Sequence, residues 1–317
     1  MTHQFLLYTV FGSIIILALA FDLGLINKKD KIISYKTAMI QTAFWVLLAL
    51  SFFGFLWYEE GDKIALEYLS AYLMEWSLSV DNIFVFILIF SSFKVREKFY
   101  GRVLLIGILM AIFFRILFIT IGVSLVERFE WVLYIFGLFL LYTGYKMFAS
   151  NEEEEFDPHD SKIYKFLKKF LPLAPTDGDG KYIIKQNGRP VYTTLFVVVV
   201  LLAAIDLVFA LDSIPAVMGI SREKLVIYTS NIFAVLGLRS LFFLLRGAVS
   251  KFDYLQQGIA IVLVFIGIKM LVEHWIAWIP KHVQVMISLG VILLCITGSI
   301  VYSIYHQKKG TPKDVIE

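Results

Sequence analysis

Cysteine and charge are both scarce in this chain. Its 317 residues include one cysteine, Cys295, so neither an internal disulfide framework nor a thiolate metal cluster can form. Charged residues make up 17% of the sequence, whereas 59% are hydrophobic and 16% aromatic. Because soluble globular domains average about 25% charged residues, this composition indicates a membrane protein. The formal net charge of +3 gives no indication of a nucleic-acid partner.

Long apolar runs recur from one end of the sequence to the other. Most of them approach the roughly 20 residues that a helix needs to cross a bilayer. They predict an all-α, polytopic transmembrane bundle of about nine spans, forming a single domain over residues 1–317. The expected spans are 5–26, 37–57, 64–90, 102–124, 130–149, 192–218, 225–245, 255–273 and 283–304.

The basic residues between these runs predict the orientation of the chain. The first and third connections are rich in lysine and arginine, whereas the second and fourth carry one basic residue each, Lys63 and Arg128. By the positive-inside rule, the N-terminus is then outside and the C-terminus cytoplasmic. Arg222 and Lys224, on an expected outer loop, agree less well with this assignment. The first run has no basic residue before it, so we interpret it as an uncleaved span.

One connection, residues 150–191, is long enough to form a cytoplasmic loop with structure of its own. It opens with four consecutive glutamates at 152–155, which could collect cations, although such runs are more often simply solvated. Further on, the segment KYIIKQNGRPVYT predicts a β-hairpin, because Asn187 and Gly188 suit a type I′ turn between two β-rich flanks.

Two of the apolar runs contain pairs of acidic residues. Glu75 and Asp81 lie six residues apart in EWSLSVDNIFVF, and Asp206 and Asp212 have the same spacing in AIDLVFALDSIPAV. Ionisable side chains inside a membrane are costly and commonly mark the path of an ion or a proton. These four carboxylates are therefore the leading candidates for a functional site.

The acid pairs belong to two similar units, residues 64–149 and 192–273. In each unit the acidic helix is followed by a helix with a mid-span arginine, Arg115 or Arg239, and then by a helix ending in GYKM or GIKM. Three helices is an odd number, so the second unit enters the membrane from the opposite side. Such a 3+3 inverted repeat, formed by spans 3–5 and 6–8, is typical of secondary transporters, whose substrate site lies at the repeat interface.

Helix geometry predicts different roles for the four acids. A spacing of six residues separates two side chains by roughly 120° around a helix and about 9 Å along it, so one pair cannot easily chelate one ion. Inversion instead lets Asp81 and Asp212 meet across the pseudo-twofold axis as central ligands. Glu75 and Asp206 are then expected toward opposite mouths of the pathway.

Neutral oxygens near the central acids are expected to complete the site. Pro215 removes the helical donor to the Leu211 carbonyl, which is then free beside the acidic residue that follows it. Asn82 and Ser213 are adjacent to the central acids in the sequence, and Asn231 is a less certain accessory candidate.

Oxygen ligands without cysteine or histidine favour a hard divalent cation such as Mn²⁺, Ca²⁺ or Mg²⁺. A pure proton path stays open. So does a structural role in which the acids only neutralise Arg115 and Arg239, which we expect to be counter-charges; it is less favoured because each charge near the bilayer centre costs about 2.5 kcal/mol or more. We expect no resident cofactor and no enzymatic activity, since the sequence has neither a phosphate-binding loop nor a nucleophile with a base.

The motifs EWSLSVDNIFVF, FALDSIPAV, TSNIFAVLGLRS and VFIGIKML resemble the TerC/Alx family of integral membrane proteins, and the resemblance extends from the first span to the last. It implies a bacterial inner-membrane protein of metal-ion homeostasis, chiefly manganese efflux, with an older association with tellurium resistance. The acidic residues of the family motifs correspond to Glu75, Asp81, Asp206 and Asp212, and the motif asparagine to Asn82. Many members also have a glutamate where this chain has Ala203, and its loss affects the ligand set.

The leading hypothesis is therefore a Mn²⁺ exporter driven by proton exchange, because export of a divalent cation opposes an inside-negative potential. A second hypothesis is a non-transporting membrane factor, serving tellurite resistance or the maturation of membrane and secreted proteins. It predicts that the loop at 150–191 is indispensable. A third is an exporter of small organic cations, which would need an aromatic-lined cavity.

Overall fold

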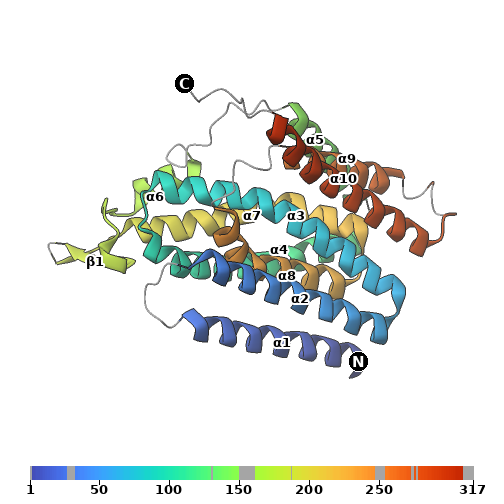
Figure 1. Cartoon of the computed structure of the whole chain (residues 1–317), viewed down its shortest axis with the longest axis horizontal. Coiled ribbons are helices and arrows are strands. Elements are labelled where there is room, and N and C mark those ends of the chain that lie inside the picture. The colour runs from blue at the N-terminus through green and yellow to red at the C-terminus, as the bar shows by residue number, and fades with distance from the viewer. Residues whose placement is uncertain are drawn as a thin grey trace.

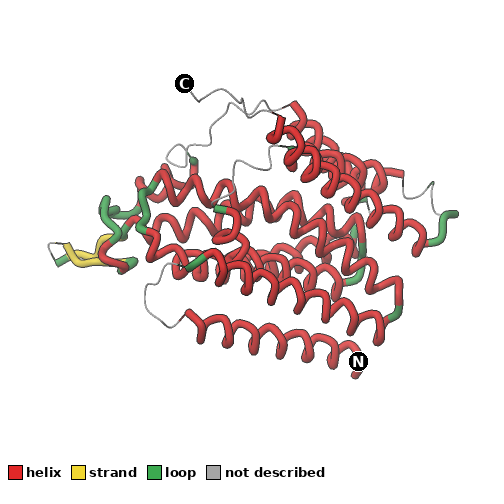
Figure 2. The backbone as a smooth tube through the Cα atoms, in the orientation of Figure 1, coloured by secondary structure: helices red, strands yellow, loops and turns green. Residues whose placement is uncertain are grey.

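A computed structural model shows a bundle of long helices with one small hairpin at its end (Figures 1 and 2). It describes residues 2–26, 33–129, 131–149, 161–186, 188–246, 254–272, 275 and 278–309. The long helices are α1 (Thr2–Ile26), α2 (Tyr35–Glu60), α3 (Asp62–Ser92), α4 (Tyr100–Arg128), α5 (Val132–Ala149), α7 (Thr194–Ile220), α8 (Lys224–Leu245), α9 (Leu255–Val272) and α10 (Lys281–Lys309). The short elements are the 3₁₀ turns η1 (Glu97–Phe99) and η2 (Gly178–Gly180), the helix α6 (Lys162–Phe170), and the strands β1 (Ile183–Gln186) and β2 (Arg189–Tyr192). The all-α fold class is confirmed.

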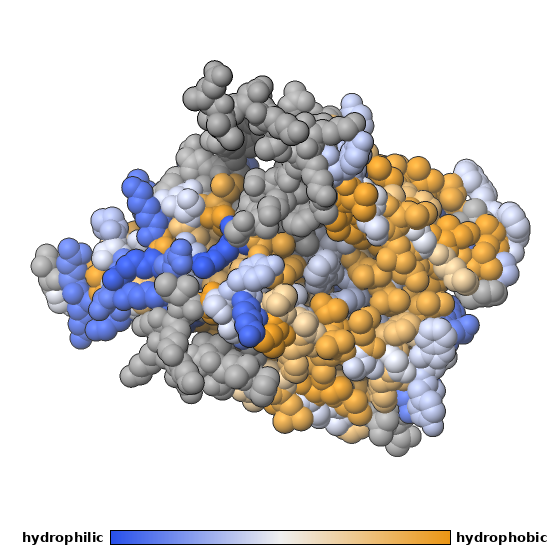
Figure 3. All heavy atoms as spheres, in the orientation of Figure 1, coloured by the Kyte–Doolittle hydropathy of each residue, from blue (hydrophilic) through white to orange (hydrophobic). Residues whose placement is uncertain are grey.

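The surface of the bundle is suited to a lipid environment. Five helical segments are long and apolar enough to cross a membrane, namely Tyr35–Glu60, Glu97–Arg128, Thr194–Ile220, Lys224–Leu245 and Val283–Ser303. Apolar residues cover much of the visible sides of the helices, whereas hydrophilic residues gather at the end that carries β1 (Figure 3). A long helix coincides with each expected apolar run, but the count of nine spans and their orientation remain predictions.

Local signals in the sequence define several helix ends. Ser34 caps α2, with its side chain accepting a hydrogen bond from the Thr37 amide at 3.3 Å. Ser161 caps α6 in the same way through the Tyr164 amide at 3.2 Å. Between α2 and α3 there is only Gly61, whose φ of 87° belongs to the left-handed region that glycine adopts at little cost. This tight connection makes α2 and α3 neighbours.

The helices of the two proposed repeats pack mainly against each other. Helix α3 contacts α7 and α8, and α4 contacts the same two helices, while α5 pairs with α9. Helices α5, α9 and α10 form a group beside the others in Figure 1. If α3 is interchanged with α7, α4 with α8 and α5 with α9 in this list of contacts, the same pairs of helices result. This is the pattern that an inverted repeat would produce, although the repeat itself stays a prediction.

Helices α5 and α9 pack so closely that their backbones are in direct contact. A Cβ atom added to Gly267 would lie 2.8 Å from the carbonyl oxygen of Gly137, and one added to Gly144 would lie 2.9 Å from that of Ala260. The partner number falls as the α5 number rises, so the two helices are antiparallel. Small residues at these crossings permit the close contact, as they do in other membrane helix pairs.

An aromatic cluster holds α3 in place on the other side of the bundle. The Phe52 ring lies 5.6 Å from Phe11, 5.4 Å from Tyr68 and 5.3 Å from Phe233, measured between ring centroids. These rings come from α1, α2, α3 and α8, and all are buried. Ring contacts of this kind stabilise a core beyond simple area burial. The helix that carries Glu75 is therefore fixed by packing on several sides.

The expected hairpin is present at the end of the bundle. Strands β1 and β2 pair antiparallel from Ile183 opposite Tyr192 to Gln186 opposite Arg189. Gly188 has a φ of 76°, as a tight turn requires, whereas Asn187 and the glutamates at 152–155 lie outside the described residues.

Candidate functional site

Arg115 on α4 is the centre of a buried charged network. Its guanidinium donates two hydrogen bonds to Asp206 on α7, from Nε to Oδ2 at 2.8 Å and from Nη2 to Oδ1 at 3.1 Å. Both side chains are only 1% exposed. Two parallel bonds between a guanidinium and a carboxylate fix orientation as well as distance. The pair therefore joins α4 rigidly to α7.

The same guanidinium also binds residues of two further helices. Its Nη1 donates to Glu75 Oε1 on α3 and to Asn231 Oδ1 on α8, the latter at 3.0 Å. The amide of Asn231 is oriented in turn, because its Nδ2 donates to the carbonyl of Ile227 at 3.0 Å. One arginine thus connects α3, α4, α7 and α8.

The two carboxylates of the network can accept more hydrogen bonds than Arg115 donates to them. Two carboxylates face one guanidinium, which leaves one negative charge if both are ionised. Ser213 is buried and lies within electrostatic reach of Glu75. Neither Ser213 Oγ nor Glu75 Oε2 has a hydrogen-bond partner of good geometry among the described atoms. A buried carboxylate oxygen and a hydroxyl oxygen that lack well-aligned hydrogen bonds are groups that an incoming cation could use.

The structure places Glu75 and Asp206 differently from the arrangement expected from the sequence. They do not lie on opposite approaches to a central site, because both are bound by Arg115. The six-residue spacing gives only the angle and the axial distance between two side chains on the same helix. It does not include the packing of α3 against α7, nor the long side chain of Arg115 that enters between them from α4. The two acids and Arg115 therefore form a contact among α3, α4 and α7.

The pairing of Asp81 with Asp212 stays a prediction, because both side chains lie outside what the structure describes. Asn82 is buried at 2% exposure, as expected for a residue inside the bundle. Helix α7 continues through Pro215, which leaves the Leu211 carbonyl without its helical donor, although the Leu211 side chain itself is 46% exposed. Among the described residues, no three acidic, histidine or cysteine side chains form a group able to hold a metal.

Two more positions singled out in the sequence are buried. Arg239 lies on α8 at 3% exposure, and its role as a counter-charge stays a prediction. Ala203 lies three residues before Asp206 on α7 and is also buried, at 1% exposure. A methyl group there contributes no ligand, so the carboxylates of this region come from other positions.

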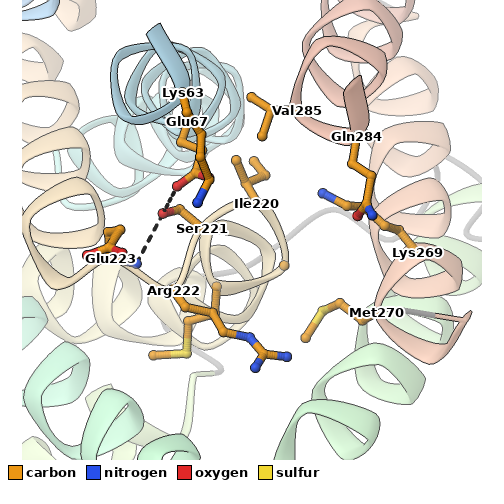
Figure 4. Close-up of a pocket in the computed structure, with 12 residues that line it drawn as sticks. Lys63, Glu67, Ile220, Ser221, Arg222, Glu223, Lys269, Met270, Gln284 and Val285 are labelled. Atoms are coloured by element: carbon orange, nitrogen blue, oxygen red, sulfur yellow. Dashed lines mark hydrogen bonds and ion pairs between the residues drawn. The ribbon is translucent and has the colours of Figure 1, made fainter. Parts of the chain in front are cut away.

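A third buried carboxylate, Glu67, was missed by the sequence reasoning. It lies near the start of α3, is 5% exposed, and accepts a hydrogen bond from Ser221 Oγ at 2.5 Å (Figure 4). Lys63 Nζ lies 3.8 Å from Glu67 Oε1, and Lys269 lines the same cavity of about 130 Å³. The signal was present, since Glu67 falls within the expected span 64–90, but it is not one of the acids paired at a six-residue spacing.

An apolar helical bundle with a hydrogen-bonded charged network in its interior is the architecture of an integral membrane protein. The sequence profile of the integral membrane protein TerC family matches residues 60–311, and the chain belongs to this family. The resemblance seen in the sequence motifs is thereby confirmed.

Several curated relatives match nearly the whole chain. An uncharacterized membrane protein of Rickettsia felis is 40% identical over 294 residues, covering 93% of this chain and 97% of the relative. One from Myxococcus xanthus is 39% identical, covering 97% and 95%. A protein of Escherichia coli (strain K12) described as a candidate membrane-bound redox modulator, Alx, is 38% identical and covers 90% of each chain. No solved structure matches.

Proposed function

We propose that this protein transports a divalent metal cation across the bacterial inner membrane, with efflux of Mn²⁺ as its principal activity and proton exchange as the driving force. The observation that carries the proposal is the Arg115 network. It brings Glu75 of the first unit and Asp206 of the second onto one guanidinium in the membrane interior. A charge cluster between two repeats is the position that a transported ion occupies in this class of protein.

Arg115 provides a means of closing the site in the absence of a cation. Its guanidinium occupies three of the four oxygens of the Glu75 and Asp206 carboxylates, so a cation that coordinates both carboxylates through these oxygens must displace it. Released from Arg115, Glu75 and Asp206 no longer hold α3, α4 and α7 in their present arrangement. Occupation by the substrate would in this way be coupled to movement of one repeat against the other.

Coupling to protons follows from the same carboxylates. A protonated Glu75 or Asp206 is a poorer metal ligand, because the proton occupies the oxygen and removes the charge. A proton and a divalent cation therefore compete for the site. If the site faces the two sides alternately, metal leaves as protons enter, which is the exchange that efflux against an inside-negative potential requires.

The space around Asp206 favours a small substrate over an organic cation. The described residues beside it, which include Phe86 and Leu202, leave no cavity large enough for a water molecule. A bare metal ion needs little more than displacement of the Arg115 side chain. An amino acid or polyamine would need far larger rearrangement of the helices packed here.

The proposal is tested with purified protein in liposomes loaded with a Mn²⁺-sensitive dye. We expect Mn²⁺ flux that increases with an opposing pH gradient, and loss of that flux in Glu75→Gln and Asp206→Asn. Asp62→Asn serves as the matched control, because it removes one carboxylate from the exposed first turn of the same helix. The proposal is wrong if wild-type protein moves no Mn²⁺ under any gradient, or if both buried variants transport at the wild-type rate.

The description of one relative as a redox modulator raises a second candidate function. Cys295 is the only cysteine in the sequence, so the chain has no dithiol pair for disulfide exchange. A redox effect would then be indirect, through metal supply or a partner, as in a non-transporting factor. That alternative predicts that replacing the loop at 150–191 abolishes function. It also predicts that the Glu75→Gln variant retains function.

A further inference from the structure

A second site is suggested by a cavity at the hairpin end of the bundle. It has a volume of about 600 Å³ and lies where α3 ends, beside α6 and the start of α7. Lys94, in the turn after α3, and Lys168 of α6 line it, together with the hydroxyl-bearing residues Thr176 and Thr194. The one carboxylate in the lining, Asp177, is engaged by Arg96, whose Nη2 donates to Oδ1 at 2.7 Å. The cavity is therefore basic and rich in hydrogen-bonding groups.

Lys94 occupies a backbone position where a side chain is unfavourable. Its φ of 47° lies in the left-handed region, and its amide donates to the Ser91 carbonyl at 3.0 Å while that of Val95 donates to Phe90 at 3.1 Å. This is the hydrogen-bond pattern of a helix C-terminus at which glycine is usual. A lysine is strained there, and retained strain points to a use for the side chain. Binding of a ligand in the cavity that Lys94 lines would be such a use.

Helix α6, next to the cavity, has a surface suited to the membrane interface. It packs against α7, and on this side the Tyr164 ring lies 5.4 Å from Phe93, the residue that follows α3, while Leu167 is buried. Its other side presents Phe166 and Phe170, each 61% exposed, with ring centroids 4.6 Å apart. The remaining positions of α6 include the lysines 162, 165, 168 and 169. A short helix with exposed aromatic rings among lysines is typical of a segment that lies in the headgroup layer of anionic lipids.

We propose that this cavity binds the headgroup of an anionic phospholipid, with the phosphate between Lys94 and Lys168 and the rings of Phe166 and Phe170 in the adjoining acyl layer. Charge complementarity selects this occupant, since the two lysines face the cavity while its carboxylate is already paired. The orientation expected from the basic loops places this end on the cytoplasmic side, where anionic lipids are attracted to basic residues at the membrane surface. The site is independent of the proposed transport activity.

The test uses the full-length protein in a non-ionic detergent, with native mass spectrometry and thermal unfolding as readouts. We expect retention of phosphatidylglycerol in preference to phosphatidylcholine, and a rise in the unfolding temperature with the former only. Lys94→Gly combined with Lys168→Gln should weaken phosphatidylglycerol binding about tenfold or more. Without lipid, this variant should be at least as stable as wild type, because glycine relieves the strained position.

Lys162→Gln is the matched control, since it removes a lysine of α6 that does not line the cavity. It should retain phosphatidylglycerol as the wild type does. Three results would overturn the assignment: unchanged binding by the Lys94 and Lys168 variant, equal retention of phosphatidylcholine, or equal protection by inorganic phosphate. The last would indicate a site for the free anion.

Discussion

At the scale of single residues, the decisive feature is the number of partners that share Arg115. Its three nitrogens are bound to Glu75, Asp206 and Asn231, and all four side chains are nearly inaccessible. Buried ions stabilise a fold only when their hydrogen bonds are satisfied, and removing one partner leaves an uncompensated charge. The stability of the bundle should therefore depend strongly on Arg115.

Replacement of Arg115 by methionine should lower the free energy of unfolding by about 3–5 kcal/mol, because two carboxylates then share a buried site without a cation. Chemical denaturation in detergent measures this change. The triple variant Arg115→Met, Glu75→Gln, Asp206→Asn is the control, since it removes the charges together and should recover much of the loss. A triple variant less stable than the single one would contradict the assignment of the loss to unpaired charge.

The sequence identified the members of this network but not their partners. A charge within an apolar run is visible in the sequence, and so Glu75, Asp206 and Arg115 were all found. Their contacts depend on which faces of α3, α4 and α7 meet. Apolar residues occur on every side of a helix such as α7, so hydrophobic periodicity does not show which side faces its neighbours. Glu67 was missed for a related reason, since burial near a helix end depends on the neighbouring helices.

At the scale of elements, the closest helix contact is that of α5 with α9. The glycines of the GYKM and GIKM motifs, Gly144 and Gly267, both lie at this crossing. The motifs were noticed as a repeat in the sequence, while their role in close packing became visible only in the structure. Van der Waals contact between backbones replaces the hydrophobic effect as the source of association inside a bilayer.

A larger side chain at this crossing should force the two helices apart. A Cβ on Gly144 would lie 2.7 Å from Val264 Cγ2 and 2.9 Å from the Ala260 oxygen, so Gly144→Leu should destabilise by about 1–3 kcal/mol or more. Gly298→Leu on α10 is the matched control, because no atom lies within 4 Å of its added Cβ. Thermal unfolding of both variants is the measurement. Equal midpoints for the two variants would show that the α5 and α9 contact is not tight.

Arg96, which directly precedes η1, binds Asp177 in the loop before the hairpin. The hydrogen bond from Arg96 lowers the pKa of the Asp177 carboxyl. An acid whose pKa is lowered by folding stabilises the fold above its unfolded pKa of about 4, and this contribution is lost as the pH falls through the lower folded value.

Wild type should therefore unfold at a slightly higher temperature than Asp177→Asn at neutral pH, and the difference should vanish in acid. The effect is small because water reaches both partners of the pair. Melting curves recorded across the pH range test it. A difference that grows as the pH falls would have the wrong sign for this tether.

At the scale of the whole molecule, the arrangement of charges predicts its orientation in the membrane. The helical fold followed from composition and run length, which depend only on the sequence. Orientation depends on the asymmetry of basic loops, and the later loops are less regular than the first four connections. The hairpin end and the start of α3 lie at opposite ends of the bundle (Figure 1).

Labelling of introduced cysteines tests this orientation. In a Cys295→Ser background, Asp62→Cys near the start of α3 and Lys185→Cys in β1 place one exposed thiol at each end. A membrane-impermeant maleimide should label intact cells through Asp62→Cys only, and permeabilised cells through both. Labelling of Lys185→Cys in intact cells would reverse the predicted orientation.

The sharing of one guanidinium between α3 and α7 also sets a concentration threshold for any ion that replaces it. Only the fraction of molecules in which the carboxylates have left Arg115 can bind, so the apparent affinity falls by that fraction. If release costs about 3 kcal/mol, the reduction is about 150-fold. Abundant ions that bind carboxylates weakly would then fail to displace Arg115 and would not occupy the site. A scarcer ion with stronger coordination would bind once its concentration rises, so the proposed transport activity would respond to an excess of that ion.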